Sequence, residues 1–325
     1  MQRRHSAGGG RVCRAATQAA ARSRPDSHWE RSMKPQHVVI LGGAGYIGRQ
    51  LIELYGIHRP EIALTVVDRR FDPHVVHQLS RDSRHRFVEG DIANLPLMQA
   101  VLQPQHSKPP CVVHLLAGEV SAETSQARAG EIWSTNFDAT EAVMQLCAPS
   151  TRLMFPSSAN VFGGNDDAPD TVYDETAKPR PRYPYAETKA AMEHALSEWG
   201  GNYTCVRLGT NYGWSPGLRF NLVVNLFVRR ALQGQVLNLD GGGTHYRPFA
   251  ANIDCARALM FLSERNEAAG QLYHCVDDSY QIAQIAERVV SLVAPVRTRT
   301  VAHKVYFSSY RMSSDKLRNL GFEFT

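Results

Sequence analysis

The chain has 325 residues, 43% of them hydrophobic, so it can bury a sizeable core as one large domain or as two lobes. It contains no run of 18 apolar residues, which argues against a membrane-spanning helix. Residues 1–34 hold seven Arg and one Lys against Asp26 and Glu30, a balance of +6, so the remainder carries about −1 of the total of +5. The overall basicity is therefore no reason to expect nucleic-acid or membrane binding.

The first 34 residues form a Gly-, Ala-, Ser- and Arg-rich leader without apolar periodicity, and we expect this leader to be disordered. Two origins fit its composition: an organelle transit peptide, or an upstream extension from a wrongly assigned start. Met33 lies just before the first predicted strand and favours the second origin. The folded part is expected to comprise a first domain at 35–208 and a smaller lobe at 209–325, interleaved with it.

The folded sequence begins with an apolar strand at 38–41, a glycine turn GGAGYIG at 42–48 and a helix that starts within the turn. A second strand at 62–67 ends at Asp68, 20 residues after Gly48. Glycines permit a tight turn and the approach of a pyrophosphate to the helix N-terminus, and the acid can accept hydrogen bonds from an adenosine ribose. A solvated turn aspartate is the alternative for Asp68. The pattern predicts nucleotide binding by Gly42, Gly45, Tyr46, Ile47, Gly48 and Asp68.

Further along, a predicted helix carries a phenol and an ammonium four residues apart, at Tyr185 and Lys189. Both fall with Met192, Leu196 and Trp199 in a stripe about 80° wide. Burying an unpaired ammonium costs several kcal/mol, so a lysine in a core-facing stripe indicates a waiting partner or ligand. The alternative is that Lys189 extends along its stem to solvent.

Strands alternate with helices from 38 to about 208, where 203–208 is the sixth strand. This alternation predicts an α/β fold, a doubly wound Rossmann parallel sheet with helices on both faces. Beyond 209 the pattern loosens into helices near 254–264 and 280–292 and a strand near 272–275, which predicts a smaller C-terminal α/β substrate lobe. Ligands should bind at the C-terminal ends of the parallel strands, between the lobes.

Taken together, the glycine turn, Asp68 and the Tyr185–Lys189 pair resemble the extended short-chain dehydrogenase/reductase superfamily, and within it the NAD-dependent epimerase/dehydratase family that acts on nucleotide sugars. The resemblance covers about residues 36–322 and implies an NAD-dependent enzyme. It also implies cofactor contacts from segments GDI at 90–92, VVHLLAG at 112–118 and STNFDAT at 134–140. The residues so assigned are Asp91, Ile92, Leu115, Ala117 and Asn136, in addition to Tyr185 and Lys189.

The same resemblance implies a catalytic set of Ser158, Tyr185 and Lys189. Ser158 lies four residues before Phe162, which stands where the family usually has Tyr. Tyr185 would take the proton from a sugar hydroxyl, normally at C4, and Ser158 would hydrogen-bond the reacting oxygen. A free tyrosine has a pKa of about 10, and Lys189 and the positive nicotinamide are expected to lower it.

Three more residues are implied as substrate contacts beside Ser158. Arg247 lies in a segment, DGGGTHYRPF at 240–249, that resembles the one whose arginine grips the diphosphate, although helix capping or pairing with Asp254 is an alternative. Arg219 is expected to be a weaker phosphate or base contact. Thr210 stands where many relatives have an asparagine that touches the substrate.

The choice of reaction rests on the residues after the catalytic hydroxyl. Relatives that are 4,6-dehydratases place Asp-Glu directly after it, whereas this chain has Ala159 and Asn160. Dehydration and decarboxylation are therefore disfavoured, and a C4 epimerase of an NDP-hexose is the first reading. An NDP-keto-sugar reductase or sugar-nucleotide dehydrogenase is the alternative. A non-catalytic nucleotide- or RNA-binding relative is less favoured, because such proteins commonly lose the tyrosine or lysine.

NAD is preferred over NADP because Asp68 would repel a 2′-phosphate, although Arg69 and Arg70 could accommodate one. Homodimerisation through helices near 95–103 and 137–147 is possible on the family pattern. The six cysteines show no paired spacing and resemble the reduced thiols of a cytoplasmic protein. No histidine or cysteine spacing indicates a metal site.

Overall fold

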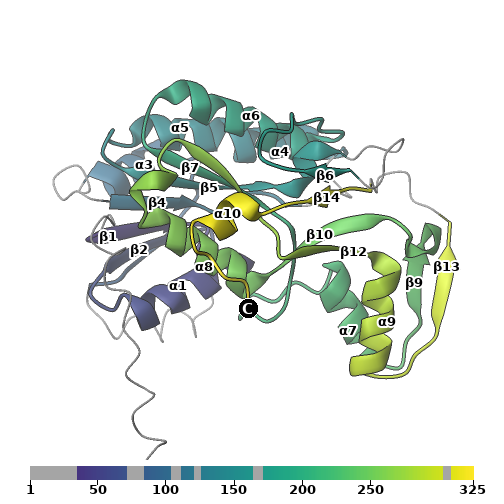
Figure 1. Ribbon diagram of the computed structural model, residues 1–325. Coiled ribbons are helices and arrows are strands. Elements are labelled where there is room, and N and C mark those ends of the chain that lie inside the picture. The colour runs from purple at the N-terminus through teal and green to yellow at the C-terminus, as the bar shows by residue number, and fades with distance from the viewer. Residues whose placement is uncertain (1–34, 72–83, 104–110, 121–125, 164–170, 303–308) are drawn as a thin grey trace, which may run out of the picture. The chain divides into compact units, whose positions relative to one another are not determined.

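The computed structural model of the chain describes residues 35–71, 84–103, 111–120, 126–163, 171–302 and 309–325. The leader at 1–34, which we expect to be disordered, lies outside these residues. A parallel sheet of seven strands forms the centre of the described part (Figure 1). The strands are β1 (His37–Leu41), β2 (Ala63–Asp68), β3 (Arg86–Glu89), β4 (Cys111–Leu115), β5 (Arg152–Ser158), β7 (Tyr203–Leu208) and β11 (Gln271–Cys275).

The strand order across the sheet is β3-β2-β1-β4-β5-β7-β11, and every neighbouring pair is parallel. The chain builds from β1 in one direction and then crosses back to β4 to build in the other, so the winding reverses between these two strands. Their ends are level, because Leu41 pairs with Leu115. This order confirms the predicted doubly wound Rossmann sheet and places its ligand crevice at the carboxyl ends of β1 and β4.

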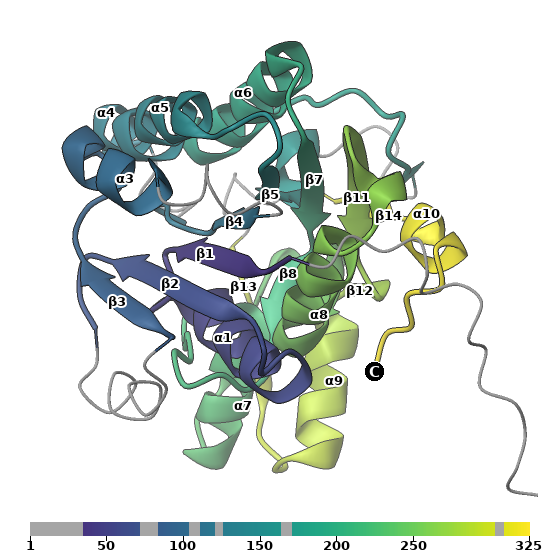
Figure 2. The same cartoon turned by 90° about the vertical axis from the view of Figure 1, so that its left-hand side faces the viewer.

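Helices cover both faces of the sheet (Figure 2). Along β1, Val38 and Ile40 face one core and Val39 and Leu41 face the other, because side chains alternate along a strand. The first core is covered by α1 (Tyr46–His58) and α8 (Asn252–Ser263). The second is covered by α3 (Leu95–Leu102), α5 (Ala139–Leu146) and α6 (Pro184–Trp199), while α4 (Ala129–Trp133) and the π-helical turn η3 (Ser134–Asp138) lead into α5.

A second, smaller lobe has its own apolar core, in which Phe227, Phe249 and Ile285 are buried. Its three-stranded sheet has the order β12-β10-β8, and β13 pairs with β9. The elements are β8 (Thr210–Tyr212), α7 (Val223–Leu232), β9 (Leu237–Asp240), η5 (Gly241–Gly243), β10 (Tyr246–Ala251), β12 (Asp278–Gln281), α9 (Ile282–Leu292) and β13 (Thr298–Val301). Five short elements complete the described chain: η4 (Ala159–Phe162), β6 (Val172–Tyr173) paired with β14 (Arg311–Met312), η6 (Asn266–Ala268) and α10 (Asp315–Asn319).

The two lobes are interleaved, and the boundary at residue 208 does not divide them cleanly. The strand expected near 272–275 in the smaller lobe is β11, which pairs with β7 at the edge of the seven-stranded sheet. The helix expected near 254–264 is α8, which packs on the large sheet beside α1. A parallel neighbour for β7 needs a helical crossover, and α8 supplies it with a largely buried apolar surface. Both elements therefore belong to the first lobe.

The five cysteines within the described ranges are free and buried. They lie in strands β4, β7 and β11, in α8 and at the end of α5. None of the helices in those ranges is both long enough and apolar enough to cross a bilayer.

Candidate active site

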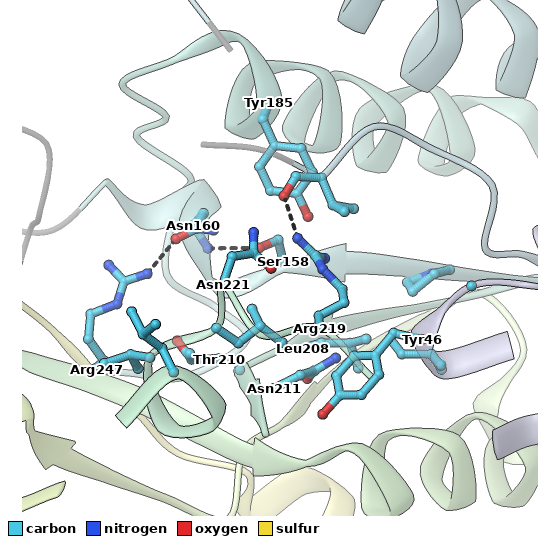
Figure 3. Close-up of a pocket in the computed structure, with 18 of the residues that line it drawn as sticks. Tyr46, Ser158, Asn160, Tyr185, Leu208, Thr210, Asn211, Arg219, Asn221 and Arg247 are labelled. Atoms are coloured by element: carbon cyan, nitrogen blue, oxygen red, sulfur yellow. Dashed lines mark hydrogen bonds between the residues drawn. The ribbon is translucent and has the colours of Figure 1, made fainter. Parts of the chain in front are cut away.

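A cavity of about 640 Å³ lies at the carboxyl ends of the central strands and extends toward the smaller lobe (Figure 3). The large sheet contributes the glycine turn after β1, the loop after β4 and the end of β5, while the smaller lobe contributes α7, β9 and β10. This volume is in the range of small-molecule and cofactor sites. Of the predicted site residues, those that line it are Gly42, Gly45, Tyr46, Ile47, Gly48, Ser158, Tyr185, Lys189, Thr210, Arg219 and Arg247.

The turn after β1 tolerates only glycine at two positions. Gly42 has φ +89°, and a Cβ there would lie 2.4 Å from the amide nitrogen of Ala117. A Cβ on Gly48 would lie 2.6 Å from the carbonyl oxygen of Gly42. Gly45 caps the first turn of α1, so the unpaired N–H groups of that helix end face the cavity side of the turn. The glycines therefore set the turn that a pyrophosphate would approach.

Asp68 ends β2 and is tied to this turn. One carboxylate oxygen accepts a hydrogen bond from the backbone N–H of Ala44 at 2.9 Å, and the other accepts from the N–H of Arg69 at 2.7 Å. The guanidinium of Arg69 pairs with Glu119 at 3.1 Å. The turn, the helix end and the acid together fit a dinucleotide: the helix end suits its pyrophosphate and the remaining lone pairs of Asp68 suit a ribose. The pairing of Arg69 with an acid weakens the case for a 2′-phosphate.

Four other predicted cofactor residues do not line the cavity. Asp91 is exposed, and its carboxylate accepts a hydrogen bond from the N–H of Ala93 at 2.9 Å. Ile92 and Leu115 are buried in the core shared with α3 and α5. Ala117 packs against that core from the loop after β4. The neighbours Leu116 and Gly118 line the cavity instead.

Asn136, the remaining predicted cofactor residue, holds the loop after β4 from beneath. Its amide oxygen accepts from the N–H of Glu119 at 2.7 Å, and its amide nitrogen donates to the carbonyl of Glu119 at 2.9 Å. A Cβ on Gly118 would lie 2.9 Å from that amide oxygen. This close approach leaves little room for a side chain at residue 118. Asn136 is thus a positioning residue in this structure.

The predicted catalytic residues converge from two elements. Ser158 is the last residue of β5, and Tyr185 and Lys189 lie on successive turns at the start of α6. The side chain of Lys189 is only 6% exposed. Its ammonium donates to the carbonyl of Pro156 at 2.9 Å and lies 4.5 Å from the ring centroid of Phe155. Lys189 therefore stays inside, and the alternative of a solvent-exposed ammonium is wrong.

Burial dominates the proton affinities of this pair. It raises the pKa of Tyr185, against a hydrogen bond from the Ser158 hydroxyl and the positive charge of Arg219, both of which lower it. Burial also lowers the pKa of Lys189 to about 8. Among the protein's own charges, that of Arg219 favours the phenolate. The expected effect of Lys189 on the pKa of Tyr185 stays a prediction.

An ion pair that the sequence did not reveal lies under the predicted catalytic residues. Glu193, one turn after Lys189, accepts two hydrogen bonds from the guanidinium of Arg207 on β7, at 2.9 and 2.7 Å. It also accepts a hydrogen bond from the hydroxyl of Ser157. Arg207 lies 4.8 Å from the ring centroid of Phe162. The sequence does contain a signal for this pair: Glu193 lies on a core-facing helix and Arg207 lies in an apolar strand, and charged residues at buried positions are usually paired.

Arg247 and Thr210 lie on the smaller-lobe side of the cavity (Figure 3). The guanidinium of Arg247 donates to the amide oxygen of Asn160 at 2.7 Å and lies 5.1 Å from the ring centroid of Tyr310. The alternative partner, Asp254, is instead paired with Arg257 at 2.6 Å. Arg247 therefore points its charge into the cavity from β10, as a diphosphate contact would.

Arg219 lies between Tyr46 and Tyr185 in the middle of the cavity (Figure 3). Its segment folds back over the glycine turn: the hydroxyl of Ser215 donates to the carbonyl of Tyr46 at 2.7 Å, and the Tyr46 hydroxyl donates to the carbonyl of Gly213 at 2.6 Å. The Arg219 guanidinium makes a 3.4 Å hydrogen bond to the carbonyl of Val120. Burial lowers the pKa of Arg219.

No group of three or more metal-ligating side chains occurs among the residues that the structure describes. The cavity is instead lined by one lysine, three arginines and two tyrosines, with Asp240 as the single acid among its described residues. Such a lining suits an anionic organic ligand.

Curated relatives of the chain act on nucleotide sugars. A dTDP-D-glucose 4,6-dehydratase of Mus musculus is 23% identical over 325 residues, covering 91% of this chain and 88% of that protein. A trifunctional UDP-glucose 4,6-dehydratase/UDP-4-keto-6-deoxy-D-glucose 3,5-epimerase/UDP-4-keto-L-rhamnose-reductase of Arabidopsis thaliana is 24% identical over 252 residues, or 75% of this chain. The chain spans only 37% of the length of that plant enzyme.

Solved structures show the same fold with the cofactor in place. MoeE5 in complex with UDP-glucose and NAD is 25% identical, with a TM-score of 0.74 over 89% of this chain and 93% of that one. Its complex with UDP-glucuronic acid and NAD is 26% identical, with a TM-score of 0.73 over 89% and 94%. The family model for the NAD dependent epimerase/dehydratase family matches residues 38–283. The chain therefore belongs to the NAD dependent epimerase/dehydratase family, whose members are NAD-dependent enzymes.

Proposed function

We propose that the protein is an NAD-dependent epimerase that inverts C4 of a nucleotide-linked hexose through a 4-keto intermediate. The observation that carries the proposal is the convergence of Ser158, Tyr185 and Lys189 in a cavity that also contains the glycine turn. Bound NAD would supply reversible hydride acceptance. Because the hydride taken from C4 is returned to the same carbon, no external reductant is consumed.

The roles of the three residues follow from their surroundings. Tyr185 removes the proton of the C4 hydroxyl and later returns it, so its phenolate must be accessible near neutral pH. Ser158 donates to the reacting oxygen as its charge changes, and its hydroxyl also lowers the pKa of the neighbouring Tyr185. Lys189, held by the carbonyl of Pro156, keeps a positive charge beneath the site and can hold the nicotinamide ribose.

The residues after Ser158 support epimerisation over dehydration. Loss of water from a 4-keto sugar needs an additional acid and base, and the positions that would supply them hold Ala159, which is buried, and Asn160. The amide oxygen of Asn160 is engaged by Arg247 at 2.7 Å. Asp240, the single acid among the described lining residues, lies at the end of β9 in the smaller lobe. The chain therefore departs from its dehydratase relatives at the positions that dehydration requires.

The test is proton NMR of the purified protein with UDP-, dTDP- and GDP-hexoses, without added cofactor and then with NAD, following the anomeric and C4 signals. We expect inversion at C4 without net change in nicotinamide, and loss of inversion in Tyr185→Phe. A 4-keto-6-deoxy product would instead make the protein a dehydratase. Absence of inversion together with NAD(P)H consumption on 4-keto sugars would favour the alternative, an NDP-keto-sugar reductase.

A further inference from the structure

A row of three polar side chains crosses the large sheet beneath the candidate active site. Ser157 on β5 is paired in register with Arg207 on β7, and Arg207 is paired with His274 on β11. All three residues are buried. Because side chains alternate along a strand, they lie on the same face of the sheet as Leu153 and Cys205, which α6 covers. Polar groups therefore meet at one level of an otherwise apolar face.

Glu193 on α6 joins the members of this row. Its carboxylate accepts two hydrogen bonds from the Arg207 guanidinium, at 2.9 and 2.7 Å, and one from the Ser157 hydroxyl. Arg207 also donates to Nε2 of His274 at 3.4 Å, and Nδ1 of that ring donates to the carbonyl of Ser313 at 2.9 Å. Burial, and then the charge of Arg207, lowers the pKa of His274 to about 3, so its ring stays neutral and Nε2 can accept. The guanidinium is thus held in one orientation.

Stability alone does not account for this buried ion pair, because the desolvation of two charges offsets most of their attraction. The pair does supply a carboxylate whose orientation is set by a two-point contact. The oxygen of Glu193 that accepts from Nε of Arg207 also accepts from the Ser157 hydroxyl. The hydrogen bond from Ser157 to Glu193 therefore ties the end of β5 to α6 in a defined position.

This tie lies between two residues that the proposed chemistry uses. The carbonyl of Pro156 accepts from the Lys189 ammonium at 2.9 Å, and Ser158 lines the cavity with Tyr185 (Figure 3). Ser158 belongs to β5, whereas Tyr185 and Lys189 belong to α6. The relative placement of these two elements decides whether the hydroxyl and the phenol reach the same substrate oxygen.

We propose that Glu193 is a positioning residue, which holds Ser157 and thereby places Ser158 correctly relative to Tyr185. The inference rests on the proposed C4 epimerase and adds to it a residue that does not itself line the cavity. Without the tie the binding surfaces remain, but the hydroxyl and the phenol are no longer held at a fixed separation. A displacement of about 1 Å can cost about a hundredfold in rate, so the effect should fall on kcat.

The first test removes the tie without leaving a buried charge unpaired. Ser157→Ala keeps the pair of Glu193 with Arg207, and Ser157→Thr restores the hydroxyl. With UDP-, dTDP- and GDP-hexoses and saturating NAD, we expect Ser157→Ala to lower kcat for C4 inversion about tenfold or more. KM and the calorimetric affinity for NAD should stay within about twofold of the wild type, and Ser157→Thr should recover most of kcat.

Thr204→Val is the matched control for the loss of a buried hydroxyl. The Thr204 side chain lies on β7 and donates to the carbonyl of Ala268 at 2.7 Å, so it takes no part in joining β5 to α6. This variant should lower the melting temperature and leave kcat unchanged. An unchanged kcat in Ser157→Ala, or equal losses of kcat in Ser157→Ala and Thr204→Val, would overturn the positioning role. If Ser157→Thr does not fold, this comparison decides alone.

The protonation of Tyr185 gives a second measurement that needs no turnover. Burial raises the pKa of Tyr185, while the Ser158 hydroxyl and the charge of Arg219 lower it. If Ser158 moves away, the pKa of Tyr185 should rise. The other ionisable side chains near the phenol are Lys189 on the next turn of α6, Tyr183 and Tyr310.

This pKa can be measured in the NAD-bound protein by NMR of tyrosine labelled at Cζ, with the signal assigned by its loss in Tyr185→Phe. We expect a higher pKa in Ser157→Ala, a return in Ser157→Thr and no change in Thr204→Val. An unmoved pKa in Ser157→Ala would overturn the positioning of Ser158. Absence of C4 inversion by the wild type on every hexose would instead overturn the proposed epimerase, and the titration would still decide whether Ser157 positions Ser158.

Discussion

The two sides of the cavity are built differently. On the cofactor side the polar side chains are held by the backbone: Asp68 accepts from two backbone N–H groups, and Asn136 exchanges two hydrogen bonds with the backbone of Glu119. On the substrate side, Arg219 and Arg247 donate hydrogen bonds to neutral oxygens, those of the Val120 carbonyl and the Asn160 amide. The first side is a rigid backbone cradle for a ligand common to the whole family. The second side presents the guanidinium groups of Arg219 and Arg247 to the cavity, and we expect these charges to determine which substrate binds.

The largest effect is expected from a change in the rigid side. Gly42→Ala would place a Cβ 2.4 Å from the Ala117 amide nitrogen at φ +89°, so the turn must shift. We expect at least a hundredfold loss of NAD affinity by calorimetry and destabilisation of about 2 kcal/mol or more. Gly56→Ala is the matched control, because nothing lies within 4 Å of its Cβ and it sits in the helix α1. Unimpaired NAD binding in Gly42→Ala would contradict the rigidity of this side.

The buried ion pair beneath the predicted catalytic residues gives the next largest effect. Arg207→Leu leaves the carboxylate of Glu193 buried without its cation, which we expect to cost about 3–5 kcal/mol in urea unfolding. Glu193→Gln combined with Arg207→Leu should recover part of this loss. The exposed pair of Arg128 with Glu131 is the control, and Arg128→Ala should leave the transition unchanged. Equal effects in both pairs would show that burial at 193 and 207 is unimportant.

Lys189→Met should stabilise the protein while it abolishes catalysis. The pKa of Lys189 falls from 10.5 to about 8 on folding, so between these pH values the unfolded chain binds more protons and stability rises with pH. At pH 7 the wild type bears the full free-energy cost of burying the Lys189 ammonium, and the methionine variant should be more stable by about 1–3 kcal/mol. The difference should shrink as the pH rises from 8 toward 10. The exposed Lys178→Met should show no such dependence.

The smallest effect concerns pH and separates the two arginines. The charge of Arg219 lowers the pKa of Tyr185, so Arg219→Gln should raise that pKa and move the acid limb of the kcat/KM profile to higher pH. The charge of Arg247 acts on Tyr183 and Tyr310 instead, so Arg247→Gln should leave the limb in place. A shift of the same size in both variants would remove the distinction between the two positions.

The sequence predicted the sheet and the cofactor turn because both depend on local pattern. The strand at 38–41, the glycines at 42–48 and Asp68 lie within one βαβ unit, and their spacing alone determines how they meet. The apolar stripe of α6 likewise predicted that Lys189 is buried, since the helical period determines which residues share a face. Homodimerisation through the helices near 95–103 and 137–147 stays a prediction.

The remaining features depend on contacts between distant segments. Glu193 contacts Arg207 only because α6 packs beside β7. The strand β11 pairs with β7 in the large sheet, and α8 is the crossover helix between them, an arrangement that no local pattern indicates. Arg219 reaches Tyr185 because its irregular segment folds back over the glycine turn. The choice of Leu116 over Leu115 as a lining residue follows from where β4 ends, which a sequence fixes only to within a residue or two.

The hydrogen bonds from Ser215 and Tyr46 that join the smaller-lobe segment to the glycine turn have a thermodynamic consequence. A ligand that orders the turn also orders the segment bonded to it, so the free energy of cofactor binding is shared between the two lobes. Saturating NAD should therefore raise the melting temperatures of both lobes together and merge their unfolding into one cooperative transition. Severing the link with Ser215→Ala should let the lobe that carries Arg219 unfold ahead of the lobe that holds the cofactor.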